Sequence, residues 1–270
     1  AGESYETLFS LPVGDRQIIR YSIPACCANI EGPNAIAVLP DYTFLISDYI
    51  GKRLLYYNKD GSPGSIVQLN KIGIGYVRDM RLRGEKIYLL ETGYHNIWVH
   101  ILTLNGDLIA SEEIPYQYVF INQQKDFTLE TALTGLAIDC EDNIVLEVEG
   151  GRRLFPLPEV QKQPDPDQIN QGLKCANQRY FVSTPGLWRN PQITAGEMVF
   201  ETILSARLGG FSFLEVFQDG SFYLQRDDVM PGSVIKVDQT VHFIDANGTV
   251  QGSARIPLAE FFYPIERSSA

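Results

Sequence analysis

The stretch GPNAIAVLPDYTFLISDYIGKRLLYYNKDG, residues 32–61, consists of short apolar runs separated by polar turns. The runs are rich in β-branched and aromatic residues, and Gly, Pro, Asn and Asp cluster between them. This composition is typical of strands joined by tight hairpin turns. A sustained helical period is absent from the stretch, so it predicts consecutive antiparallel strands.

The same order of strand, turn, strand and acidic residue recurs along the chain. It is found in NAIAVLPDYTFLISD, RDMRLRGEKIYLLE, TGLAIDCEDNIVLEVE and FLEVFQDGSFYLQRD. A second turn follows about 20 to 28 residues later, in YNKDGSPGSIV, LTLNGDLIAS, QPDPDQIN and FIDANGTVQGSARI. Two successive hairpins make four strands, and the first two units lie about 43 to 45 residues apart. Both features are typical of β-propeller blades.

We therefore predict that residues 1–270 form one all-β domain, a β-propeller of four-stranded antiparallel blades. Four blades are visible, at about 32–70, 79–115, 134–208 and 211–258. The third is long enough to hold an insertion or a degenerate extra blade, so five or six blades are expected. Strands that would complete the last blade are not evident after Leu258, which implies an unusual closure or a missing C-terminal blade. A β-sandwich is the alternative fold.

Bulk composition excludes several classes of function. The net charge of -11 argues against a nucleic-acid partner, because phosphate binding needs clustered Lys and Arg. No apolar run approaches the roughly 20 residues that span a bilayer, so membrane insertion is not expected. Hydrophobic content of 44% is ordinary for a soluble globular protein.

The four cysteines, Cys26, Cys27, Cys140 and Cys175, contain no CxxC pair, so a zinc site is not expected. Cys140 could pair with Cys175, or all four could be buried thiols. An even count permits an oxidising compartment. It slightly favours an extracytoplasmic location without establishing one.

Two of the three histidines lie in ETGYHNIWVHILTLNGDLI, residues 91–109. His95 and His100 are five residues apart, so on one continuous strand their rings point to opposite faces. A shared metal is therefore not expected. The Asn105-Gly106 pair that follows is a strong hairpin signal.

Residues 32–61 and LLETGYHNIWVHILTLNGDL resemble NHL-type β-propeller repeats. Asp48, Gly51 and Arg53 match the carboxylate, glycine and basic residue of that repeat. Glu91, Gly93 and His95 match in the second unit, with Asn96 in place of the basic residue. The third unit matches loosely through Glu149, Gly150 and Arg152, and the fourth departs from the pattern. The resemblance covers about residues 30–258 and implies a fold more than a function.

The fold gathers loops from every blade at one end, which favours a binding or scaffold module for a protein or small ligand. A carboxylate at the end of a second strand has the alternative role of binding turn amides or pairing with Arg. Tyr and Arg are enriched at interface hot spots. The residues predicted near the binding rim are Asp48, Tyr49, Arg78, Asp79, Tyr94, His95, Arg152, Arg153 and Arg226.

The alternative function is a metal-dependent hydrolase similar to the gluconolactonase group of propellers. That resemblance implies a Ca²⁺ or Mg²⁺ ion bound by Glu, two Asn and Asp. Glu31 occupies one ligand position, but Asp79, Thr134 and Ser212 stand where the others belong. We therefore predict no catalytic residue, metal or cofactor on the main interpretation.

A bond between the neighbouring Cys26 and Cys27 would close a strained ring. We predict that peptide mass mapping under non-reducing conditions finds no Cys26–Cys27 bridge. Detection of that bridge would overturn the prediction.

Overall fold

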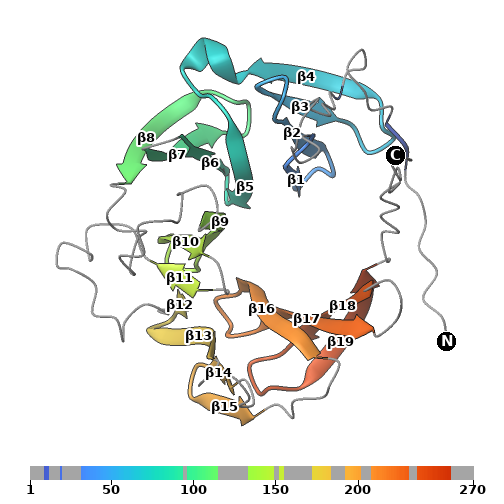
Figure 1. The fold of residues 1–270 in the computed structure, drawn as a ribbon, viewed down its shortest axis with the longest axis vertical. Coiled ribbons are helices and arrows are strands. Elements are labelled where there is room, and N and C mark those ends of the chain that lie inside the picture. Colours follow the sequence, from blue (N-terminus) through green and yellow to red (C-terminus); the bar gives the residue numbers. More distant parts are fainter. Residues whose placement is uncertain are drawn as a thin grey trace, which may run out of the picture. The chain divides into compact units, whose positions relative to one another are not determined.

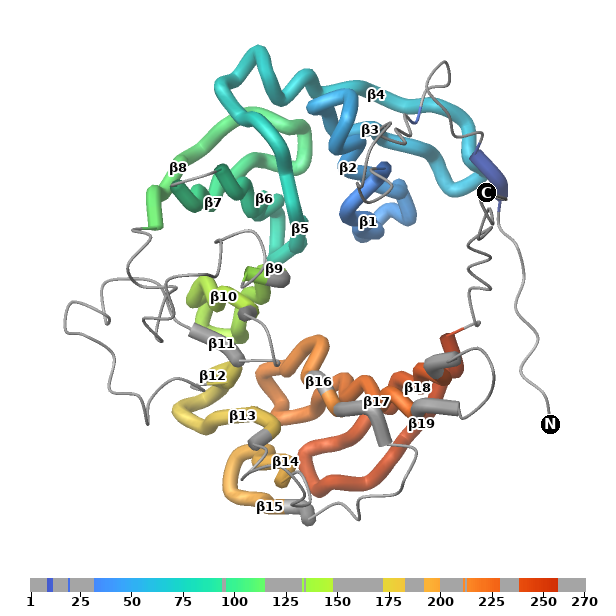
Figure 2. Tube along the Cα trace, viewed as in Figure 1, coloured from blue at the N-terminus to red at the C-terminus, as the bar shows by residue number. Residues whose placement is uncertain are grey.

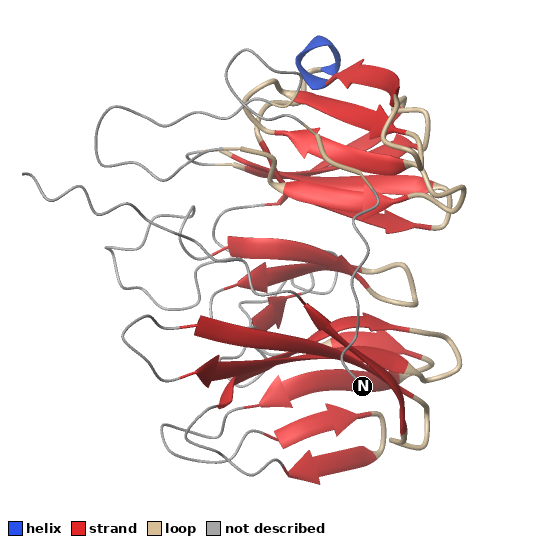
Figure 3. Ribbon diagram, turned by 90° about the vertical axis from the view of Figure 1, so that its right-hand side faces the viewer, coloured by secondary structure: helices blue, strands red, loops and turns tan. Residues whose placement is uncertain are grey.

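The computed structural model describes residues 9–11, 19, 32–93, 96–114, 133–148, 152–154, 172–183, 192–201, 208–230 and 236–256. These residues form 19 strands and one short 3₁₀ helix, η1 (Leu69–Ile72). Figure 3 shows how fully strands dominate the described part of the chain. Within these residues, no helix is long and apolar enough to cross a membrane.

The strands form five sheets in which each strand lies beside its neighbour in the chain (Figure 1). The first sheet contains β1 (Ala35–Val38), β2 (Phe44–Asp48), β3 (Arg53–Tyr57) and β4 (Pro63–Gln68). The second contains β5 (Val77–Arg83), β6 (Lys86–Thr92), β7 (Ile97–Thr103) and β8 (Leu108–Ile114). The third contains β9 (Leu133–Ile138), β10 (Ile144–Val148) and β11 (Arg152–Leu154).

The last two sheets each have four strands. One contains β12 (Leu173–Cys175), β13 (Gln178–Ser183), β14 (Gln192–Ala195) and β15 (Met198–Glu201). The other contains β16 (Leu208–Val216), β17 (Phe222–Met230), β18 (Lys236–Ile244) and β19 (Val250–Ile256). The predicted fold class, an all-β propeller of four-stranded antiparallel blades, is confirmed.

Residues 134–208, predicted as one blade with an insertion or an extra blade, contribute to two separate sheets. The turn predicted in QPDPDQIN lies outside the described residues. Cys140 and Cys175 are both disulfide-bonded, so the alternative of four free thiols is wrong for these two. Cys26 and Cys27 lie outside the described residues.

The chain divides into two compact units, Ser4–Lys174 and Cys175–Ala270 with Ala1–Glu3. In the unit Ser4–Lys174, β5 contacts both β1 and β9, so the first strands of the three sheets are neighbours. Figure 2 traces the chain outward from each of these strands to the last strand of the same sheet. In the other unit, β13 contacts β16.

An aspartate lies in five of the hairpin turns and explains why acidic turns recur. Its carboxylate accepts a hydrogen bond from the amide two residues later, which is the geometry of an Asx turn. These N···O distances are 2.9 to 3.0 Å at Asp41, Asp60, Asp139, Asp219 and Asp245. Hydrogen bonds to the ionised form lower the pKa of Asp41, Asp60, Asp219 and Asp245.

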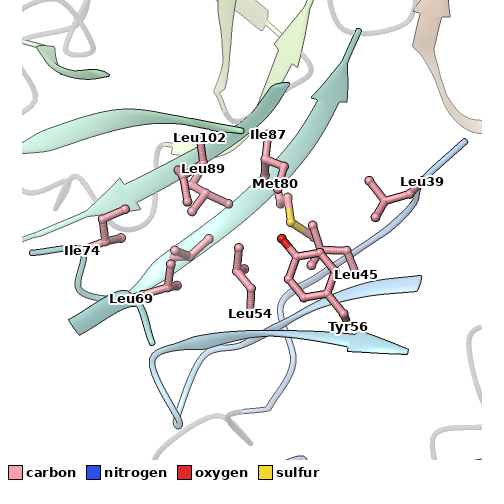
Figure 4. Packing of buried hydrophobic residues seen from close by; sticks show 11 residues of the cluster. Leu39, Leu45, Leu54, Tyr56, Leu69, Ile74, Met80, Ile87, Leu89 and Leu102 are labelled. Atoms are coloured by element: carbon pink, nitrogen blue, oxygen red, sulfur yellow. The ribbon is translucent and has the colours of Figure 1, made fainter. Parts of the chain in front are cut away.

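Apolar side chains fill the space between the first and second sheets (Figure 4). Leu45 and Leu54 come from the first sheet, and Ile87 and Leu89 come from the second, and all four are completely buried. The 3₁₀ helix contributes Leu69 to the same cluster. The packing holds the first and second sheets against each other.

Replacing Ile87 with Ala should lower the free energy of unfolding by about 2 to 5 kcal/mol, because a cavity remains in the cluster. Ile36 is the matched control, since it is 62% exposed and Ile36→Ala should change stability by less than about 0.5 kcal/mol. Urea unfolding monitored by tryptophan fluorescence measures both. Equal losses in the two variants would contradict the assigned core.

Candidate functional site

A group of aromatic and basic side chains lies where the β2–β3 turn meets the segment before β5. The rings of Tyr49 and Tyr76 are 4.8 Å apart between centroids, with an angle of 36° between their planes. Lys52 places its ammonium 4.0 Å from the centroid of the Tyr76 ring, within the range of a cation–π interaction. Tyr76 is 43% exposed.

Arg78 follows Tyr76 by two residues, at a register shift between Val77 and Asp79 in β5. It is half-buried. Among the residues that the structure describes, the Arg78 side chain makes no hydrogen bond or ion pair. We call Tyr49, Lys52, Tyr76 and Arg78 the rim patch. It contains two of the predicted rim residues and two that the sequence interpretation did not select.

Asp48 has the alternative role that the sequence analysis allowed for acidic groups at strand ends. It is 1% exposed. Its carboxylate accepts hydrogen bonds from the Gly51 amide at 3.2 Å and from Arg53 Nε at 2.7 Å. The side chain thereby closes the β2–β3 turn that carries Tyr49 and Lys52.

Asp79 links two neighbouring first strands. Its Oδ1 accepts hydrogen bonds from the Met80 amide at 2.8 Å and from Arg81 Nη1 at 2.9 Å. Its Oδ2 accepts one from the Leu136 amide of β9 at 2.8 Å. Burial raises the pKa of Asp79 even though Arg81 and the two amides favour its ionised form. All of these contacts are within the fold, so Asp79 acts as a tie between β5 and β9.

Of the remaining predicted residues, the structure describes the side chain of Arg226. Arg226 lies on β17, in the other unit, and donates hydrogen bonds to Asp228 at 2.9 and 3.1 Å. Arg152 and Arg153 lie on β11, but their side chains fall outside those described. Tyr94, His95 and Glu31 also lie outside the described residues.

A hydroxyl, an imidazole and a carboxylate form a chain of hydrogen bonds across the second sheet. Ser111 Oγ lies 2.8 Å from His100 Nδ1, and Glu91 Oε2 lies 2.8 Å from His100 Nε2. An ionised carboxylate can only accept, so Nε2–H donates to Glu91. With the imidazole neutral, Ser111 O–H then donates to Nδ1. We call Ser111, His100 and Glu91 the relay.

Glu91 also connects the relay to the rim patch. Burial disfavours its charged form, but hydrogen bonds from His100 and the Gly75 amide outweigh burial and lower the pKa of Glu91. The positive charge of Lys52 adds to this effect. A Cβ added at Gly75 would collide with Glu91 Oε1, so the absence of a side chain allows this close approach. The segment bearing Tyr76 is thus held by the relay carboxylate.

Strand register explains why Glu91 binds a histidine when Asp48 binds an arginine. Asp48 lies opposite Arg53 in its sheet, while Glu91 lies opposite Trp98. A tryptophan ring offers no charged donor to Glu91. Its carboxylate instead bonds to His100, the next residue on the same face of β7.

The relay was not predicted from the sequence, although two segments contain the spacing of its histidine and serine. VHILTLNGDLIAS, residues 99–111, and VHFIDANGTVQGS, residues 241–253, place a histidine and a serine eleven residues apart around Asn-Gly. In the structure His242 Nδ1 lies 2.7 Å from Ser253 Oγ. A histidine–serine pair is therefore a repeated feature, and in the second sheet a carboxylate hydrogen-bonds to its histidine.

Metal ligation has no support among the residues described, which hold no group of three or more His, Cys, Asp or Glu suited to one ion. Glu31, the ligand of the hydrolase alternative, lies outside them. The metal-dependent hydrolase remains a prediction from the sequence.

No protein-family model matches the sequence, and comparison with curated proteins gives no match. Solved structures similar to the chain include a protein of unknown function from Bacteroides caccae, with a TM-score of 0.43, 11% identity, and coverage of 83% of this chain and 82% of that chain. Virginiamycin B lyase from Staphylococcus aureus gives a TM-score of 0.40, 12% identity, and coverage of 83% of this chain and 84% of that chain. Neither likeness extends to function.

The lowered pKa of Glu91 predicts a pH-dependent contribution to stability. A carboxyl group whose pKa is lower in the folded state stabilises the fold above its ordinary pKa of 4.5 and loses that contribution as pH falls through the folded pKa. Glu91→Gln should therefore be less stable than the wild type at pH 7, and the difference should shrink as pH falls below 4.5. Urea unfolding at several pH values measures it. A difference independent of pH would refute the assigned ionisation.

Proposed function

We propose that this protein is a binding module that recognises an anionic segment of a partner protein at the rim patch. The observation that carries the proposal is the combination of an exposed Tyr76 ring, braced by Tyr49 and Lys52, with an Arg78 that has no ion pair among the described residues. A guanidinium without a carboxylate partner favours a bidentate contact with carboxylate or phosphate.

The rim patch is also held in place before any partner arrives. Asp48 closes the turn that carries Tyr49 and Lys52, and the Gly75 amide is bound by Glu91 on the other side. A surface of this kind loses little conformational entropy on binding, which favours affinity. Tyr and Arg are common interface anchors because they combine a large contact area with specific polar groups.

The NHL-type identity of the repeat belongs to the same proposal. It is supported by the first sheet, where Asp48, Gly51 and Arg53 form one hydrogen-bonded unit around the turn. The three residues that define the resemblance are therefore in mutual contact. The proposed consequence is that this turn, repeated with different residues in other sheets, supplies the binding end of the protein.

A peptide-display selection tests the proposed function. The wild-type protein should enrich peptides rich in Asp and Glu, and their affinity should fall as salt rises because exposed charges are screened. Tyr76→Ala and Arg78→Ala should each weaken binding by more than about 1 kcal/mol, roughly fivefold, in calorimetric titrations with an enriched peptide.

Tyr42 is a matched control for the selection. It is 62% exposed, and Lys59 lies 5.1 Å from its ring centroid, so it reproduces the lysine–tyrosine contact away from the rim patch. Tyr42→Ala should leave affinity unchanged. Peptides that bind both rim variants as tightly as the wild type would show that the rim assignment is wrong.

A further inference from the structure

We propose that Ser111 is a nucleophile that reacts with activated carboxylic esters, with His100 as its general base and Glu91 as a positioning residue. This activity goes beyond the proposed binding function and does not depend on it. It rests on the relay, on the exposure of Ser111, and on a second histidine–serine pair whose histidine has no hydrogen bond to a carboxylate among the described residues.

The relay combines an accessible hydroxyl with a sheltered base. Ser111 lies on β8, the last strand of its sheet, and is exposed. His100 is 5% exposed, so its ring is shielded, and with the imidazole neutral its Nδ1 accepts the hydrogen bond from Ser111. A hydroxyl within hydrogen-bond distance of a neutral imidazole nitrogen is the arrangement that general-base activation of serine requires.

Glu91 fixes the tautomer that leaves Nδ1 free to accept a proton. Its Oε2 takes the Nε2–H hydrogen bond at 2.8 Å. The same carboxylate stabilises the imidazolium that forms when Nδ1 gains a proton. The amide of Gly75 also donates to Glu91, which holds the carboxylate from the side away from His100.

The reaction follows from these positions. Ser111 Oγ attacks the carbonyl carbon of the ester as its proton passes to His100 Nδ1. The bond between that carbon and the leaving oxygen breaks, and the leaving alcohol takes the proton from Nδ1. Water then attacks the acyl–Ser111 ester, giving a proton to Nδ1 that returns to Ser111 Oγ as the carboxylic acid departs.

Ser253 provides an internal reference within the same molecule. It is exposed and lies 2.7 Å from His242 Nδ1, so it reproduces the hydroxyl and the imidazole. Leu89 lies opposite His100, and Leu224 lies opposite His242. Two residues further along, the second sheet has Glu91 and the last sheet has Arg226. Burial and the positive charge of Arg226 lower the pKa of His242, and the negative charge of Asp228 opposes them in part.

The test is reaction of the intact protein with a fluorophosphonate, followed by peptide mapping to compare Ser111 with Ser253. Ser253 has a histidine of its own, so the expected difference comes from the carboxylate. Loss of the carboxylate from the Ser–His–Asp arrangement of serine proteases costs about 10⁴-fold in rate, and we expect Ser111 to react at least about tenfold faster than Ser253. His100→Asn should abolish the difference. Glu91→Gln should reduce the ratio of the two rates, and Glu91→Asp should restore part of it.

Hydrolysis of p-nitrophenyl acetate should be lost in Ser111→Ala and retained in Ser253→Ala.

The ratio of the two rates separates chemistry from folding, because a loss of global structure affects both serines. Thermal unfolding of each variant confirms that it is folded. Equal rates at Ser111 and Ser253, or no modification of Ser111, would overturn the proposal. So would ester hydrolysis that persists unchanged in Ser111→Ala. A rate ratio unchanged in Glu91→Gln would remove Glu91 from its positioning role. The binding proposal is tested separately, by Tyr76→Ala and Arg78→Ala, and none of these results decides it.

Discussion

Apolar packing between the first and second sheets is the constraint on which the candidate site depends. Leu54 and Leu89 are completely buried in the shared cluster, and their neighbours along the strands carry the polar groups. Moving one residue along a strand changes the face on which the side chain lies, and so decides whether it enters the core or reaches solvent. The hydrophobic contact therefore sets the position of the rim patch, although no rim residue contributes to it.

Hydrogen bonds to carboxylates then fix the conformation of the backbone next to this core. Asp48, Asp79 and Glu91 each accept at least one backbone amide hydrogen bond, and each lies at or near a strand end. A buried or half-buried carboxylate with several donors is costly to displace, because its charge would lose compensation. These three residues thereby restrict the turns that join the strands. These three carboxylates act on the protein's own backbone.

Hairpin patterning predicted the fold class because the period of two and the Asp-based turns are local signals. The relay was not predicted, because His100 meets partners nine and eleven residues away, and only strand register determines those pairings. The turn between β12 and β13 was also missed. Ala176 and Asn177 both have positive φ, of 49° and 61°, and alanine rarely adopts that conformation. The turn at Ala176 and Asn177 is therefore difficult to predict from the local sequence. Tyr76 was missed because its contact with Tyr49 requires two sheets to pack together.

Three of the sheets pair their third and fourth strands in the same register. Leu55 lies opposite Ile66, His100 opposite Ser111, and His242 opposite Ser253, at the same step of the third and fourth strands. The backbone pairing there accommodates either two apolar side chains or two side chains joined by a hydrogen bond. At these positions the polarity of the side chains varies between sheets, while the backbone pairing stays the same. A substitution at such a position can therefore change the chemistry of one sheet while the other sheets keep the scaffold.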